Sequence, residues 1–305
     1  MEPWHDVEIS ESALWRASDY PDKESLAVDL SRADIGPLID RARLLAQEGQ
    51  AVATATAEDL NIGPLAPIMD RLRSTLMSGS GIALLRGLPV DDLSQTEIEL
   101  VYWGIGLCLG RPVSQSVMGE RLGHVRDMTA TDPHARAYRN RNELTPHTDP
   151  ADLLSFLCLR PAKTGGVSRF VSSLTIHEQM RSARPDLLAQ LYQGFRYHRF
   201  GEQGEGDPAI TPHRIPVFSR RGGLVSCRYV RQYIEMAAAE HPEILISPLE
   251  REALDYFEAQ AGMASLHVEF TLDAGEAILA NNFTVLHARS SYEDHTEPEL
   301  KRHLL

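Results

Sequence analysis

The chain has 305 residues, of which 43% are hydrophobic, and its formal net charge at pH 7 is −13. This length is enough for one large domain or two modest ones, and the composition is ordinary for a globular protein. The acidic balance argues against a nucleic-acid surface, which needs clustered Lys and Arg, but it leaves room for a small anionic substrate in a local basic pocket.

The predicted elements begin with a helical flank over residues 1–80. Apolar residues at helical spacing predict helices in "IGPLIDRARLLAQEG" (35–49) and "APIMDRLRSTLMSGSG" (66–81), and Gly49 is placed to end the first. "GIALLRGLPV" (81–90) is typical of a buried strand. The next helix is predicted at 94–110, with Ser94 and Glu97 forming a capping box.

Residues 119–146 are polar and lack periodicity, so they form either a pocket-lining loop or a solvated surface loop. A strand then leads to a helix that Thr175 is expected to cap, and Arg184-Pro185 opens another. A further helix is predicted at 247–262, with Ser247 as its cap. Alternation over 266–272 and two strand patterns within 273–289 follow. We therefore expect one α+β domain over residues 1–305, with β-strands on both sides of a helical insert near 175–262.

Targeting and redox signals are sparse. "MEPWHDVEIS" lacks the basic and apolar regions of a signal peptide, and no apolar run reaches membrane-spanning length. The three cysteines, at 108, 158 and 227, are too few and scattered for a disulfide framework or a thiolate zinc site. We expect a cytoplasmic protein whose partner is a small molecule, with neither nucleic acid nor membrane as a partner. Assembly into a homo-oligomer stays open.

A metal-ligand pattern begins at the stretch "ELTPHTDPADLLSFLCLR". His147 and Asp149, taken as strand residues at i and i+2, would point to one face, and His287 ends a later strand pattern. Two histidines and one carboxylate form the facial triad that suits non-haem Fe(II), whereas zinc prefers a tighter tetrahedral shell. Two other His-x-carboxylate pairs act as decoys. His241 lies in a loop, and His267 is expected on the solvated side of an amphipathic strand.

Arg302 strengthens the triad hypothesis. An oxidising Fe(II) site needs an electron-donating co-substrate, and 2-oxoglutarate can chelate iron through its keto oxygen and the adjacent carboxylate. Its distal carboxylate then needs a bidentate cation, for which Arg is the best match. Taken alone, Arg302 is better explained as a surface arginine near a C-terminus. Its place after His287 favours the co-substrate role.

The ordered set "HTD" (147–149), "GGVS" (165–168), "NNFTVLHAR" (281–289) and "KRHLL" (301–305) resembles the taurine dioxygenase (TauD/TfdA-type) family of Fe(II)/2-oxoglutarate-dependent oxygenases. The resemblance covers roughly residues 80–305. It implies a double-stranded β-helix, or jelly roll, with His147, Asp149 and His287 as iron ligands. It also implies that Ser168, where Thr is commoner, and Arg302 contact 2-oxoglutarate. Because Asp149 is not Gly or Ala, oxygen transfer is favoured over halogenation.

The resemblance implies an Fe(II)/2-oxoglutarate-dependent dioxygenase that uses O2, releases succinate and CO2, and most simply hydroxylates a small metabolite. A non-catalytic sensor that binds metal and 2-oxoglutarate, or a zinc hydrolase with the same ligands, remains an alternative. Substrate contacts are predicted at five positions, each of which could instead be a surface or salt-bridge residue: Tyr138, Asn142, Arg228, Tyr229 and Arg231.

Overall fold

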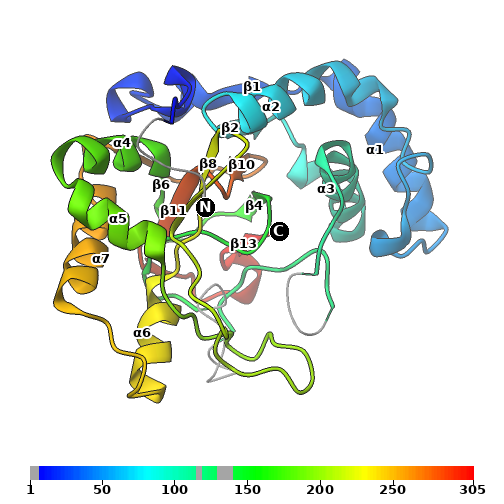
Figure 1. The fold of residues 1–305 in the computed structure, drawn as a ribbon. Coiled ribbons are helices and arrows are strands. Elements are labelled where there is room, and N and C mark those ends of the chain that lie inside the picture. Colours follow the sequence, from blue (N-terminus) through cyan, green and yellow to red (C-terminus); the bar gives the residue numbers. More distant parts are fainter. Residues whose placement is uncertain (1–6, 115–118, 129–139) are drawn as a thin grey trace.

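The computed structural model describes residues 7–114, 119–128 and 140–305, and it contains two main β-sheets flanked by helices (Figure 1). The five-stranded sheet has the order β1-β2-β10-β4-β13, and the four-stranded sheet has the order β3-β11-β6-β9. The strands of the first sheet are β1 (Ala27–Asp29), β2 (Ile82–Arg86), β10 (Ala277–Asn281), β4 (Leu153–Arg160) and β13 (His303–Leu304). Those of the second are β3 (Leu144–His147), β11 (Val285–Arg289), β6 (Ser168–Ser172) and β9 (His267–Phe270).

Two short strand pairs complete the β-structure that is described. They are β5 (Thr164–Gly165) with β12 (Tyr292–Glu293), and β7 (Phe218–Arg221) with β8 (Leu224–Cys227). The helices are α1 (Arg32–Gln47), α2 (Ala66–Ser78), α3 (Gln95–Leu109), α4 (Ser173–Ala183), α5 (Pro185–Gln193), α6 (Arg231–Glu240) and α7 (Pro248–Ala261). None of the helices in these ranges is long and apolar enough to cross a membrane.

Apolar side chains on alternate sides of the strands separate the layers. In β2, Ile82 and Leu84 belong to the core between the two main sheets, whereas Ala83 and Leu85 pack with α1, α2 and α3 on the outer face. This alternation follows from the two-residue period of a strand. A third core lies under α4, α5 and α7 and takes Leu286 from β11. Figure 1 shows these two groups of helices on opposite sides of the strands.

Local capping signals set most helix boundaries. The Ser94–Glu97 capping box begins α3, and the Ser247–Glu250 box begins α7, as predicted. The expected cap of α4 was wrong: the side chain of Ser172 accepts the backbone N–H of Thr175 and is the N-cap. Thr175 instead donates its hydroxyl to the carbonyl of Trp15 at 2.8 Å, a long-range contact that no local motif reveals.

The flank and the insert are each more mixed than expected. The flank contributes β1, which pairs in parallel with β2, in addition to α1 and α2. The insert contains the β7–β8 hairpin as well as α4 to α7. Because β3 and β11 pair antiparallel within the four-stranded sheet, segments about 140 residues apart in the sequence meet at one position.

Candidate metal centre

The three predicted ligands converge at the ends of two neighbouring strands. His147 ends β3 and lies directly opposite His287 of β11, with 4.2 Å between the two ring centroids. His287 Nε2 lies 3.4 Å from Asp149 Oδ2, and His147 Nε2 lies 3.9 Å from Asp149 Oδ1. One ligand atom from each residue falls within 4.8 Å of the others. This set could therefore hold one metal ion on a single face.

The contacts that position Asp149 differ from the predicted ones. Strand β3 ends at His147, so Asp149 is not a strand residue. The backbone N–H of Thr148 donates to the carbonyl of Tyr229 at 2.8 Å, and the N–H of Tyr229 donates to Thr148 Oγ1 at 3.0 Å. The N–H of Asp149 donates to Asn282 Oδ1 at 3.1 Å. Two distant segments thus hold the carboxylate beside the histidines.

The protonation states suit metal binding. His147 Nδ1 lies 2.7 Å from the carbonyl oxygen of Thr145, which can only accept, so Nδ1 carries the proton and Nε2 is left as the ligand atom. Burial, together with the nearby His287, lowers the pKa of His147 to about 4. Burial opposes ionisation of Asp149, but His287 and His147 outweigh it and lower the pKa of Asp149 to about 2. At neutral pH, a neutral imidazole and a carboxylate therefore already face the site.

The two decoy pairs differ from the triad in their surroundings. His241 is exposed, as expected, and its Nδ1 lies 2.9 Å from Glu243 Oε1. His267 was expected on a solvated face, and that expectation was wrong: the residue is only 7% exposed, although β9 is the edge strand next to β6. Among the described residues, neither decoy belongs to a cluster that could hold a metal.

A cavity of about 230 Å³ lies next to the triad strands, and both predicted co-substrate residues, Ser168 and Arg302, line it. Arg302 is 5% exposed, its Nη1 has no hydrogen-bond partner, and burial lowers the pKa of its guanidinium. The guanidinium carbon lies 4.9 Å from the centre of the Tyr292 ring. A buried guanidinium that keeps one N–H group without a partner in a cavity wall is suited to binding a carboxylate.

The predicted substrate residues are not gathered into one pocket. Tyr229 is fully buried and packs on Phe257 with ring centroids 4.7 Å apart, so its side chain belongs to the core. The guanidinium of Arg231 is paired with three carboxylates, of Glu235, Asp255 and Glu258. The salt-bridge alternative therefore describes Arg231 better. Arg228 and Asn142 are exposed and stay predictions, and Tyr138 lies outside the described residues.

Sequence reasoning missed two residues that support the triad, Thr148 and Asn282, and one buried arginine, Arg289. Arg289 is 7% exposed and follows His287 by two positions. The one sequence signal for Arg289 was its position within "LHAR". That signal is weak, because an arginine that ends a strand is usually exposed.

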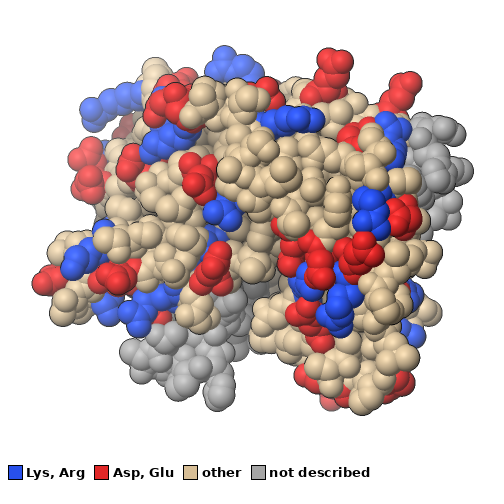
Figure 2. Space-filling view, turned by 90° about the vertical axis from the view of Figure 1, so that its left-hand side faces the viewer, with Lys and Arg blue, Asp and Glu red and all other residues tan. Residues whose placement is uncertain are grey.

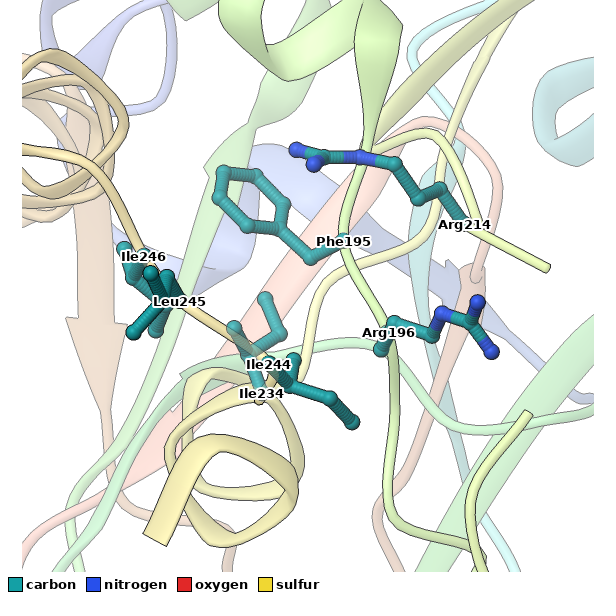
Figure 3. Close-up of a pocket in the computed structure, with 7 residues that line it drawn as sticks. All are labelled: Phe195, Arg196, Arg214, Ile234, Ile244, Leu245 and Ile246. Atoms are coloured by element: carbon teal, nitrogen blue, oxygen red, sulfur yellow. The ribbon is translucent and has the colours of Figure 1, made fainter. Parts of the chain in front are cut away.

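A second hollow, drawn in Figure 3, lies away from the triad and has a volume of only about 20 Å³. Its wall is largely apolar, with the Phe195 ring facing the segment 244–246. In the view of Figure 2, acidic and basic side chains are interspersed rather than gathered into a basic face. Neither feature competes with the triad as a functional site.

Similarity to known proteins agrees with the site. The chain is 27% identical to FR-33289 synthase of Streptomyces rubellomurinus, over 97% of this chain and 88% of that protein. It is 24% identical to the taurine hydroxylase-like protein SAT17 of Stachybotrys chartarum, over 97% and 78%. A solved structure of asparagine oxygenase with Fe(II), 2S,3S-3-hydroxyasparagine and succinate matches with a TM-score of 0.66 and 19% identity, over 92% of each chain.

The non-heme iron oxygenase OrfP, solved with Fe and alpha-ketoglutaric acid, matches with a TM-score of 0.64 and 15% identity, over 91% of this chain and 92% of that one. These two structural matches support the jelly-roll fold. Residues 49–305 match the family described as "Taurine catabolism dioxygenase TauD, TfdA family", which extends the expected resemblance upstream of residue 80. The chain therefore belongs to the TauD/TfdA family of Fe(II)/2-oxoglutarate-dependent oxygenases.

Proposed function

We propose that the protein is a dioxygenase that binds Fe(II) through His147, Asp149 and His287 and uses 2-oxoglutarate and O2 to hydroxylate a small metabolite. The observation that carries this proposal is the convergence of two imidazoles and one carboxylate within 4.8 Å. Such a set leaves three coordination positions open for the co-substrate and oxygen. When bound, iron and 2-oxoglutarate supply the oxidising power, with release of succinate and CO2.

The protein's own residues position and shield the reactants. Arg302 is proposed to bind the distal carboxylate of 2-oxoglutarate, and the Ser168 hydroxyl is proposed to donate a hydrogen bond to it. Phe156, whose ring centroid lies 5.9 Å from that of His287, contributes apolar surface beside the triad. Such surface excludes water and strengthens the electrostatic interactions within the site.

Two other functions remain testable. A non-catalytic sensor would bind 2-oxoglutarate without turning it over, and a zinc hydrolase would not need Arg302. The unpartnered Nη1 of Arg302 in the cavity wall favours the oxygenase over the hydrolase. The oxygenase and the sensor differ in turnover, so succinate formation separates them.

The experiment is a metabolite screen for substrate-stimulated succinate formation under Fe(II) and, separately, Zn(II). His147→Ala and His287→Ala should each abolish iron binding, because two remaining ligands cannot hold a facial site. His241→Ala is the matched control, since this exposed histidine also pairs with a carboxylate two residues away. Activity only with Zn(II), or full iron binding in both triad variants, would refute the proposal.

An amino-acid-like metabolite is the substrate class we infer. The support comes from the matched structures, which hold 2S,3S-3-hydroxyasparagine in asparagine oxygenase and (3S)-hydroxy-L-Arg in OrfP. A panel of free amino acids in the succinate assay tests the substrate class, and stimulation only by compounds of another class would overturn it.

A further inference from the structure

Arg289 is a buried arginine close to both parts of the site. It shares the inward face of β11 with His287, two positions away, and lies directly opposite Ser168 of β6. It is 7% exposed and does not itself line the cavity that Ser168 and Arg302 share. Arg289 is therefore paired with one residue of the cavity wall without lining the cavity itself.

Among the residues that the structure describes, no carboxylate neutralises the charge of Arg289. Its Nη2 donates to the carbonyl oxygens of Asn140 and Asn142, at 2.8 and 2.7 Å, and its buried Nε has no partner. Within 7–114, 119–128 and 140–305, no Asp or Glu forms an ion pair with it. A guanidinium is not deprotonated in proteins, so Arg289 carries its positive charge at neutral pH. A buried cation without a counter-charge is costly unless a bound anion supplies one.

Tyr292 connects Arg289 to the cavity. The guanidinium carbons of Arg289 and Arg302 lie 5.0 and 4.9 Å from the centre of the same Tyr292 ring. The two cations are consequently no more than about 10 Å apart, a range over which unit charges in a protein still interact appreciably. An anion held by Arg302 therefore lies within the field of Arg289.

We propose that Arg289 is a positioning residue whose charge makes the cavity selective for a dianionic 2-oxo acid, by stabilising the distal carboxylate that Arg302 binds. This inference rests on the proposed use of 2-oxoglutarate. Arg289 acts through space and through the shared Tyr292 ring, without touching the co-substrate. A monoanionic 2-oxo acid, which places no charge beside Arg302, gains little from Arg289.

The test compares two five-carbon acids that differ in the distal carboxylate. 2-Oxoglutarate and 2-oxovalerate are titrated into the anaerobic Fe(II) protein while the metal-to-ligand charge-transfer band is followed. Arg289→Gln should weaken 2-oxoglutarate binding about tenfold, or about 1.4 kcal/mol, and 2-oxovalerate binding less than about twofold, which lies within the spread of a neutral contact. Arg289→Lys should retain most of the selectivity, because it keeps the charge although it loses the two-carbonyl contact. Arg169→Gln is the control: Arg169 lies on β6 but is a third exposed and paired with Glu269.

The outcomes separate the two proposals. If wild type shows no charge-transfer band with 2-oxoglutarate, the proposed function fails. If wild type binds and Arg289→Gln weakens both acids equally, Arg289 only anchors the Asn140–Asn142 backbone, and this inference is wrong. Equal losses in Arg289→Lys and Arg289→Gln would likewise refute a role through charge. Thermal melting of each variant identifies one that fails to fold. If Arg289→Gln does not fold, the binding of the two acids is compared between Arg289→Lys and wild type.

Discussion

Replacing Arg302 tests most directly whether the cavity binds 2-oxoglutarate. The side chain is 5% exposed, lines the cavity and keeps an unpartnered Nη1, so a bound carboxylate would gain a charge-assisted hydrogen bond. Such a bond contributes about 1.5–3 kcal/mol, so Arg302→Ala should raise the dissociation constant for 2-oxoglutarate by roughly ten- to a hundredfold. Arg302→Lys should recover only part of the loss, because an ammonium keeps the charge but not the planar fork.

The assay is an anaerobic titration of the Fe(II) protein with 2-oxoglutarate, read at the charge-transfer band. Iron affinity is measured separately and should change little, because no triad atom contacts the guanidinium. Loss of the contact with the Tyr292 ring should lower the free energy of unfolding by about 0.5–2 kcal/mol, which a melting curve checks. Arg169→Ala serves as the control, because this arginine of β6 is a third exposed and already paired with Glu269. An unchanged titration midpoint in Arg302→Ala would refute the assignment and transfer the role to another basic residue.

Four further changes have expected outcomes. Asp149→Gly should abolish hydroxylation and open a position for chloride, and full activity in that variant would exclude Asp149 as a ligand. Asn282→Ala removes the acceptor for the Asp149 N–H and should weaken iron binding about tenfold in an equilibrium titration, as loss of ligand-supporting contacts does. Gly194→Ala should destabilise the fold by more than about 1 kcal/mol, measured by urea unfolding, because φ is 74° and an added Cβ would lie 2.3 Å from a backbone oxygen. Burial, reinforced by Arg126, lowers the pKa of His303 to about 3, so the unfolded chain binds one more proton as the pH falls from about 6.5 towards 3. Between pH 7 and 5, wild type should therefore lose about 2 kcal/mol more stability than His303→Gln, and equal losses would contradict that pKa.

Much of the secondary structure was predictable from local sequence. The capping boxes at Ser94 and Ser247 begin their helices through local contacts alone. A serine hydroxyl and a glutamate three residues later accept the free backbone N–H groups of the first turn, so no distant segment is needed. The continuous apolar run "IALL" is typical of a strand buried on both faces, because successive side chains point to opposite faces of a strand. The triad residues were also predicted from sequence, from their chemistry and order, and their convergence depends on the pairing of β3 with β11.

Only the tertiary structure decided where several side chains lie. Asp149 is held by a backbone clamp on Thr148 and by the side chain of Asn282, and neither contact has a local signature. His267 looked solvated by alternation but is only 7% exposed, and tertiary packing rather than strand alternation decides this burial. Arg289 is paired across the sheet with Ser168, which lines the proposed co-substrate cavity. The sequence determines which chemical groups each residue carries and which local elements it forms. Contacts between distant segments determine how deeply a side chain is buried and which charges lie near it. Burial and nearby charges in turn control how strongly a buried ionic side chain binds a ligand.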